Sequence, residues 1–550
     1  MAQPGPIHPA ARMHAQELRA GRLGRREFLT RVTALGVSAA AALRFVGAAS
    51  PAQANPAIRR GGTLRVAMTV RGLKDPRSYE WSEHGNLTRG ILEYLVEYQR
   101  DGTFRPMLLD GWEVNADASR YVLRLRPDVR WSNGDRFTVQ DVRRNIEGWC
   151  DQGIRTNSMA PRMKGLIDPG TGQARKGAIE IRDARTVVLN LSVPDVALIA
   201  SLADFPAAIT HAGYDEDAPF AEMIGTGPFR PLGITPGESC VIERGEHEWW
   251  GSAVFGGPFL DRVEFVDPGP DPADWVSAAR DGEVDLLYET VSGFIDAMDA
   301  IGWTRTRART AATIVLRGNQ QAERDGIRPY ADLRMRRALA LAVDNAVLLE
   351  LGQGNRGEIA ANHHVSPIHP AYADIGGVPF APGEARALAQ AAGLAGFEHE
   401  LITIDDDWQR NTGDAMAAQM QDAGLRVRRR ILPDAAFRAD WTRHPLSATA
   451  WGHRPLAVQV LALAYRSGAP WNESGYASEE FDHLLTRASA IADVDERRKV
   501  MAEIEFLLRR DAVMIQPYWR ALFNHHAGRI KNAEMHPAHE IHLYRIGFAA

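Results

Sequence analysis

Cysteine is scarce in this chain of 550 residues, which contains only Cys150 and Cys240. Two thiols can form at most one disulfide, so the disulfide-rich framework of many small secreted domains is excluded. Long apolar runs are also missing, because no segment after residue 54 reaches the roughly 20 residues that a membrane-spanning helix needs. The sequence therefore predicts globular domains with buried cores, and its length is sufficient for two or three of them.

Catalytic and nucleotide-binding motifs are missing as well. The sequence contains neither the His-Glu-x-x-His of metalloproteases nor the Gly-x-Ser-x-Gly turn of serine hydrolases. Gly61 and Gly62 precede a predicted strand at residues 63–68, and residues 225–229, Gly-Thr-Gly-Pro-Phe, lack the Lys-Ser/Thr of a phosphate loop. The carboxylates at residues 405–407 indicate a solvated turn. We therefore predict no enzyme activity and no cofactor; an exported enzyme is the less favoured alternative.

The N-terminus has the form of a twin-arginine export signal. Residues 24–30, Gly-Arg-Arg-Glu-Phe-Leu-Thr, place Phe-Leu after paired arginines, and a modestly apolar run follows at residues 32–49. Residues 52–54, Ala-Gln-Ala, have the small side chains that signal peptidase requires, which predicts cleavage after Ala54. A membrane anchor is the alternative, but the run is short and contains Arg44. We expect a periplasmic protein whose signal peptide spans residues 1–54.

The charge of the exported part excludes some partners. The whole chain has a formal charge of −5, and residues 1–54 hold seven arginines and two glutamates, a net +5, which leaves −10 for residues 55–550. An acidic protein is a poor candidate for binding phosphate backbones or anionic membrane surfaces. The sequence therefore predicts a soluble protein that binds no nucleic acid.

One tract, residues 101–142, is more informative than any other. An Asp-Gly pair at its start predicts a hairpin turn, and residues 121–125 alternate as a half-buried strand does. An Asn-Gly pair at residues 133–134 predicts a second tight turn, after which Thr138 can cap a helix that begins at Val139. By themselves these patterns indicate a small antiparallel unit with a helix attached.

The residues of this tract resemble the extracytoplasmic solute-binding proteins of ABC importers, in the peptide/nickel/opine group called bacterial solute-binding protein family 5. That family shares the order Asp-Gly-aromatic-x-Pro-x-Leu, Gly-Trp, a strand ending Leu-Arg-x-x-Val-x-Trp, and Gly-x-x-Phe-Thr-x-x-Asp-Val, and the same order occurs here. Further matches extend the resemblance over essentially the whole exported chain, at residues 225–229, 249–251, 332–344, 381–388, 472–485 and 513–517.

The block at residues 332–344 also carries local helix signals. Asp332 can cap a helix whose apolar residues keep helical spacing. Asp344 can cap a second helix, from Asn345 to Leu351, which we expect Gly352 to end.

The resemblance implies an α/β fold of the two-lobed, periplasmic-binding-protein-like class (type II, large three-domain variant), with mixed β-sheets and a ligand cleft between lobes that close by hinge motion. It implies a core domain of lobe 1 at residues 55–90, 192–315 and 511–550, an accessory domain at residues 91–191, and lobe 2 at residues 316–510. Because Cys150 and Cys240 then lie in different domains, we expect two separate buried thiols.

The resemblance also implies the function. The protein is expected to be a monomer that captures a peptide or peptide-like solute. It then delivers this solute to ABC permease subunits in the inner membrane, where separate ATPase subunits hydrolyse ATP.

Ligand contacts in the family come from three separate segments, and the resemblance assigns the same role to the corresponding residues of this chain. The candidate ligand-binding residues are Tyr79, Trp81, His84, Asn319, Gln320, Trp451, His453, Arg454 and Trp471. For each aromatic residue, packing in a core or on a surface is the alternative to contact with the solute.

Residues 451–455 depart from the family pattern in a way that concerns the solute. Dipeptide-binding relatives place an aspartate shortly after this Trp-Gly, where it pairs with the amino terminus of the ligand. This chain has His453 and Arg454 instead. An arginine fork favours a carboxylate or a phosphate, so our hypothesis is an anionic solute such as a modified peptide or an opine-like conjugate. A structural or solvent-facing arginine is the alternative.

Histidines near the C-terminus suggest a competing function, the uptake of nickel or of a metal chelate. His536, His539 and His542 recur at three-residue spacing, which on a helix would gather them on one face. Pro537 interrupts this segment, however, and no cysteine accompanies it. The sequence therefore predicts no metal site.

Overall fold

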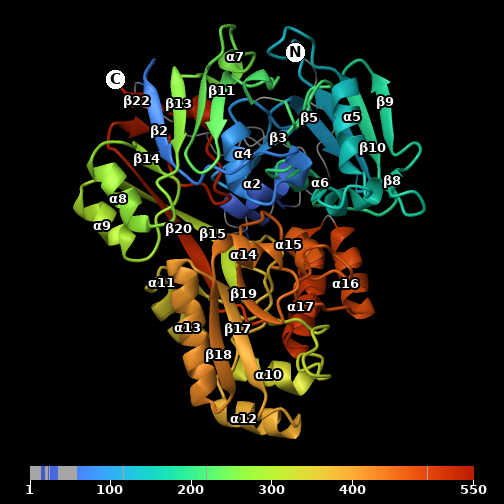
Figure 1. The fold of residues 1–550 in the computed structure, drawn as a ribbon. Coiled ribbons are helices and arrows are strands. Elements are labelled where there is room, and N and C mark those ends of the chain that lie inside the picture. Colours follow the sequence, from blue (N-terminus) through green and yellow to red (C-terminus); the bar gives the residue numbers. More distant parts are fainter. Residues whose placement is uncertain are drawn as a thin grey trace. The chain divides into compact units, whose positions relative to one another are not determined.

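The computed structural model describes residues 11, 14–15, 17–18, 23, 25–34, 58–115, 117–218, 220–491 and 493–550. The chain forms two compact units: unit 1 contains residues 1–308 and 522–550, and unit 2 contains residues 309–521. The chain passes from one unit to the other within two strands, β15 (Thr304–Gly318) and β20 (Tyr518–His526), both labelled in Figure 1. The division of unit 1 into a core and an accessory domain stays a prediction.

The first sheet of unit 1 has the strand order β11-β12-β13-β2-β14-β20. Strand β2 (Thr63–Ala67) lies parallel to both neighbours, whereas the other pairs are antiparallel. Leu64 and Val66 of β2 are both fully buried. They lie on the same face of the strand, because successive side chains point to opposite faces. The remaining strands are β11 (Phe229–Thr235), β12 (Ser239–Arg244), β13 (Arg262–Val266) and β14 (Leu286–Leu287).

The tract at residues 101–142 forms the elements that its sequence predicts. Strands β3 (Val96–Tyr98) and β4 (Phe104–Pro106) make a hairpin. Helix α5 (Val139–Trp149) starts with a capping box, in which the Thr138 hydroxyl accepts from the Gln140 amide at 3.3 Å and the Asp141 carboxylate accepts from the Thr138 amide at 2.9 Å. Strands β5 (Leu109–Val114), β6 (Arg120–Leu125), β10 (Thr186–Asn190) and β9 (Ile179–Asp183) form an antiparallel sheet in that order.

Shorter elements complete unit 1. The helices are α2 (Arg25–Ala34), α4 (Ser82–Thr88), α6 (Leu198–Ser201), α7 (Ser252–Phe255), α8 (Pro272–Arg280) and α9 (Phe294–Ala300). The 3-10 turns are η1 (Pro76–Ser78), η2 (Ala160–Leu166), η3 (Phe220–Glu222) and η4 (Leu543–Arg545). The short strands are β1 (Ile58–Arg59), β7 (Ile167–Asp168), β8 (Gln173–Ala174), β21 (Ile530–Lys531) and β22 (Gly547–Ala549).

Unit 2 is an α/β unit whose strands follow the order β15-β19-β17-β18. Figure 1 shows helix α13 beside strand β18, and helix α11 packs against α13. The strands are β19 (Leu446–Trp451), β17 (Glu398–Ile404) and β18 (Arg426–Leu432), and β16 (Gly357–Ile359) pairs with β20. The helices are α10 (Leu333–Leu341), α11 (Asn345–Gln353), α12 (Pro382–Ala391), α13 (Asp407–Asp422), α14 (Asp434–Ala439), α15 (Ala457–Ala464), α16 (Glu479–Ser489) and α17 (Val494–Arg510).

The end of helix α11 corrects one prediction. Asp332 and Asp344 cap α10 and α11 as expected, each through a backbone amide two residues later, at 2.8 Å. The helix does not stop at Gly352, however, but continues to Gln353. Gly354 ends it in the left-handed conformation at φ +55°, which a glycine adopts without steric cost.

Two predictions that concern the exported state have different outcomes. Cys150 and Cys240 are both buried free thiols, as expected, and burial raises the pKa of each to about 12. The paired arginines at residues 25–26 lie in α2, but cleavage after Ala54 falls outside the described residues. Among the helices that the structure describes, none is long and apolar enough to cross a bilayer.

Candidate functional site

Three tryptophans of unit 2 gather into one aromatic cluster. Trp441, Trp451 and Trp471 contact one another with ring-centroid distances of 6.0 to 6.4 Å, and Trp451 meets Trp471 edge to face. Trp451 and Trp471 are residues that the resemblance marks as ligand contacts, and the structure brings them together. We call these three residues the tryptophan cluster.

Strand register explains which side chains lie beside Trp451. Strands β15 and β19 are antiparallel, with Thr313 opposite Trp451, Val315 opposite Thr449 and Arg317 opposite Ser447. Alternate residues of paired strands share one face of the sheet. Arg317, Thr449 and Trp451 therefore project on the same side.

The carboxylate of Glu473 connects these side chains. It accepts hydrogen bonds from Trp451 Nε1 at 3.0 Å and from Thr449 Oγ1 at 2.8 Å, and it pairs with the Arg317 guanidinium. Both charged side chains are almost completely buried, with exposed fractions of 2% for Arg317 and 1% for Glu473. A buried carboxylate with three donors holds them in place, so Glu473 fixes the orientation of the Trp451 indole.

Arg317 and Glu473 belong to no sequence motif that marks them as functional residues. A signal existed for one of them, because Arg317 follows directly after the apolar run at residues 314–316, and a buried arginine needs a carboxylate partner. Glu473, however, is 156 positions away in the chain, and nothing local connects the two.

His364 also packs against Trp451. Its ring meets the Trp451 indole edge to face at 5.5 Å, and its Nδ1 lies 2.8 Å from the Tyr465 hydroxyl. Asn362 and His364 both adopt left-handed backbone conformations, each at φ +57°, which is uncommon for residues other than glycine. Burial, together with the nearby cationic groups, lowers the pKa of His364 well below its usual range, so the imidazole is neutral.

His453 and Arg454 are almost completely buried, whereas the hypothesis of an anionic solute requires side chains that the solute can reach. His453 is 2% exposed, and its Nδ1 accepts the backbone N–H of Ala311 at 3.0 Å. Arg454 is 8% exposed, donates from Nη1 to the carbonyl of His453 at 3.0 Å, and its own carbonyl lies 3.0 Å from His369 Nε2. A role of Arg454 in solute binding stays a prediction.

Asn319 and Gln320 lie beside the segment that contains Glu473. The Gln320 amide donates to the carbonyl of Ser474 at 2.8 Å, directly after Glu473, and the Asn319 amide donates to the carbonyl of Pro445 at 2.8 Å. The structure therefore places Gln320 beside the residue that follows Glu473, and it places Asn319 beside the residue that precedes β19.

The candidates in unit 1 lie around the start of α4. Tyr79 is fully buried and stacks on His84 with ring centroids 5.1 Å apart. Trp81 occupies the N-cap position of α4 and is half-buried beneath the Arg71 guanidinium. His84 is 5% exposed, and burial lowers its pKa to about 4. Tyr79 and His84 thus pack within unit 1, and their contact with a solute stays a prediction.

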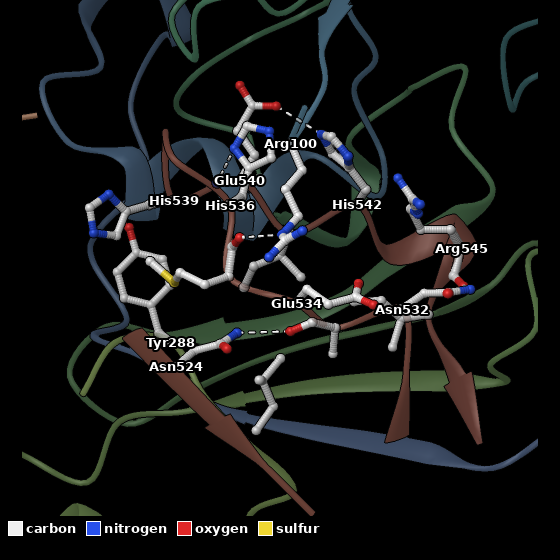
Figure 2. Close-up of a pocket in the computed structure, with 15 residues that line it drawn as sticks. Arg100, Tyr288, Asn524, Asn532, Glu534, His536, His539, Glu540, His542 and Arg545 are labelled. Carbon is white, nitrogen blue, oxygen red and sulfur yellow. Dashed lines mark hydrogen bonds and ion pairs between the residues drawn. The ribbon is translucent and has the colours of Figure 1, made fainter. Parts of the chain in front are cut away.

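Unit 1 also contains a cavity bordered by the C-terminal histidines (Figure 2). The segment is a loop and not a helix, so the three-residue spacing does not place all three histidines on one face. His536 and His542 approach each other and Glu540, with one donor atom from each residue within 4.8 Å of the others. His539 turns instead to Glu289, 3.3 Å from its carboxylate, and lies beside Tyr288.

Comparisons with known proteins agree with this architecture. A family model described as bacterial extracellular solute-binding proteins, family 5 Middle, matches residues 103–473. The dipeptide-binding protein DppE of Bacillus subtilis is 23% identical over 482 residues, which cover 82% of this chain and 86% of that protein.

Two solved structures share the fold. AgaA from A. tumefacien R10, in complex with agropinic acid, superposes with a TM-score of 0.78 at 22% identity over 89% of this chain and 99% of the other. DppA from Helicobacter pylori, in complex with the peptide STSA, superposes with a TM-score of 0.76 at 19% identity over 90% and 99%. The predicted α/β class of periplasmic binding proteins is therefore confirmed, and since the family model covers more than half of the sequence, the chain belongs to the bacterial extracellular solute-binding proteins of family 5.

Proposed function

We propose that this protein captures a peptide or peptide-like solute and delivers it, as a monomer, to the inner-membrane permease of an ABC importer. The tryptophan cluster carries this proposal. Two of its three members, Trp451 and Trp471, lie where the family's ligand contacts are expected, and Glu473 holds the Trp451 indole in one orientation. Preorganised aromatic faces bind apolar and amide groups of a peptide without a large loss of side-chain entropy. DppE, which is named a dipeptide-binding protein, and DppA, which was solved in complex with the peptide STSA, support the same solute class.

An opine-type solute is the second candidate. AgaA was solved in complex with agropinic acid and superposes with a TM-score of 0.78, and residues 453–454 are His-Arg where the family resemblance leads us to expect an aspartate in dipeptide-binding proteins. Both features favour an acidic small molecule over a free dipeptide. Native mass spectrometry of tag-free protein from its own host distinguishes the two, because the mass of the retained molecule differs between a peptide and an opine.

Replacement of Arg454 by alanine tests the charge of the solute. If the guanidinium binds a carboxylate of the ligand, we expect the affinity to fall about tenfold or more, since a charged hydrogen bond contributes about 1.5–3 kcal/mol. The measurement is a tryptophan-fluorescence titration with the molecule identified by mass spectrometry. Arg443→Ala is the matched control, because the Arg443 side chain is 76% exposed. An unchanged affinity in a folded Arg454→Ala protein would contradict an anionic contact at this position.

The export route is tested at residues 25–26. We propose that the protein reaches the periplasm through the twin-arginine pathway, supported by the paired arginines in the sequence. Replacing both arginines by lysine should leave the precursor inside the cell, whereas the unaltered chain should appear in the periplasmic fraction with Asn55 as its first residue. Fractionation and N-terminal sequencing measure both results. Normal export of the lysine variant would exclude this route.

A further inference from the structure

The cluster of His536, Glu540 and His542 has the composition of a divalent-metal site. Two imidazoles and one carboxylate are ligands that zinc-class ions prefer. One donor atom from each lies within 4.8 Å of the others, and His542 Nε2 is 2.8 Å from the Glu540 carboxylate. Figure 2 shows Glu540 and His542 joined at the border of the cavity. Small side-chain rotations are enough to place each donor atom about 2.0–2.2 Å from one shared zinc ion, the distance at which nitrogen and oxygen bind zinc.

The outer contacts of the two histidines match those of metal ligands. His536 Nε2 lies at hydrogen-bond distance from the carbonyl oxygen of Tyr98, 3.2 Å away, whereas His542 Nδ1 faces the carboxylate of Glu97 at 3.7 Å, which is too long for a hydrogen bond. A metal-binding histidine usually donates its second ring N–H to a carboxylate or a carbonyl, which fixes the ring and its tautomer. His542 Nε2 and His536 Nδ1 are thereby directed toward Glu540. His536 Nδ1 now accepts two long contacts, from the amides of Ala538 at 3.2 Å and Glu540 at 3.4 Å, which a metal would replace.

Two charged side chains border these residues. One cation competes for the carboxylate, because Arg89 Nη1 lies 3.3 Å from Glu540. Arg105, by contrast, pairs with Glu97. Since a metal has to share Glu540 with Arg89, we expect weaker affinity than at a dedicated structural zinc site.

We propose that His536 Nδ1, the Glu540 carboxylate and His542 Nε2 bind a divalent cation of the zinc class. The site lies wholly within unit 1 and is separate from the tryptophan cluster of unit 2, so it is independent of the proposed solute. Glu540 also pairs with Arg89 at the end of α4, and His536 contacts the carbonyl of Tyr98 in β3. A cation here therefore fastens the C-terminal loop onto these two elements. The sequence, by contrast, predicts no metal site in this segment.

Calorimetric titration of Zn²⁺ into tag-free, chelator-treated mature protein tests the site. The variants are Glu540→Gln and His542→Asn, which keep the side-chain shape. The matched control is His539→Ala, because His539 belongs to the same loop but contacts Glu289. We expect one ion per chain in the parent and in His539→Ala, and at least a tenfold weaker affinity in the other two. Bound Co²⁺ should also give the visible absorption of a tetrahedral site in the parent, and Zn²⁺ should raise its melting temperature.

Three outcomes would overturn the site: no stoichiometric binding in the parent, equal loss in His539→Ala, or full binding in folded His542→Asn. Circular dichroism and melting curves establish that each variant is folded. Solute binding, followed by tryptophan fluorescence, is expected to be the same in all four proteins. A failure of the metal site is thereby distinguished from a failure of the proposed solute function.

Discussion

Replacing Glu473 by alanine should lower the free energy of unfolding by about 3–5 kcal/mol, the usual cost of removing one partner of a buried ion pair. The Arg317 guanidinium, whose side chain is 2% exposed, would keep its charge without the carboxylate that pairs with it. Trp451 Nε1 and Thr449 Oγ1 would lose their acceptor as well. Urea unfolding monitored by tryptophan fluorescence measures the change, and the loss of the Trp451 contact should also weaken solute binding.

Two further variants separate the charge effect from simple truncation. Glu480→Ala removes a carboxylate whose side chain is 59% exposed, and we expect a change within about 0.5 kcal/mol. The double variant Arg317→Met with Glu473→Leu removes both charges, and its cost should be much smaller than that of Glu473→Ala. A double variant as unstable as Glu473→Ala would show that the uncompensated charge is not the cause.

Acidification should destabilise the fold steeply below pH 6.5. Burial lowers the pKa of His84, His369 and His399 to about 4, and that of His363, His536 and His542 to about 3. Because these folded-state values lie below the unfolded value of about 6.5, the unfolded chain takes up more protons as the pH falls. The contribution of the histidines to stability is complete above pH 6.5 and is lost toward pH 3–4, by up to about 1.4 kcal/mol per pH unit for each histidine.

Two buried carboxyl groups act in the opposite direction. Burial raises the pKa of Glu505 to about 9 and of Glu93 to about 8, so each folded-state value lies above the usual one. Their contribution is fully present below about pH 4.5 and is lost as the pH rises toward 8–9. We therefore expect the melting temperature to be highest near pH 7, where the opposing effects of the histidines and the carboxyl groups balance, and to fall on both sides.

Melting curves between pH 4 and 9 measure this profile. Glu505→Gln should flatten the alkaline side of the profile. On the acidic side, His399→Gln should reduce the pH dependence of the free energy of unfolding by up to about 1.4 kcal/mol per pH unit. Replacement of His483, an exposed histidine, is the control. A melting temperature that stays constant from pH 7 to pH 5 would contradict the role of the buried histidines.

Local structure could be predicted from the sequence wherever one short segment contains its own cause. Thr138 and Asp141 are three residues apart and form the capping box that starts α5. Asp332 caps α10 through an amide two residues later. Helix α11 ends two residues later than predicted, because Gly354 and not Gly352 adopts the left-handed conformation, and the sequence offers both glycines as helix ends.

The sequence by itself determined the family, the order of the elements and the small set of candidate positions, since turns, caps and strand alternation depend on neighbouring residues. Only the tertiary structure decided which distant groups meet. Arg317 finds Glu473, and His542 joins His536 and Glu540 while His539 turns away. The physical reason is that a buried charge or imidazole needs a partner in space, and sheet register and loop path choose that partner independently of sequence distance.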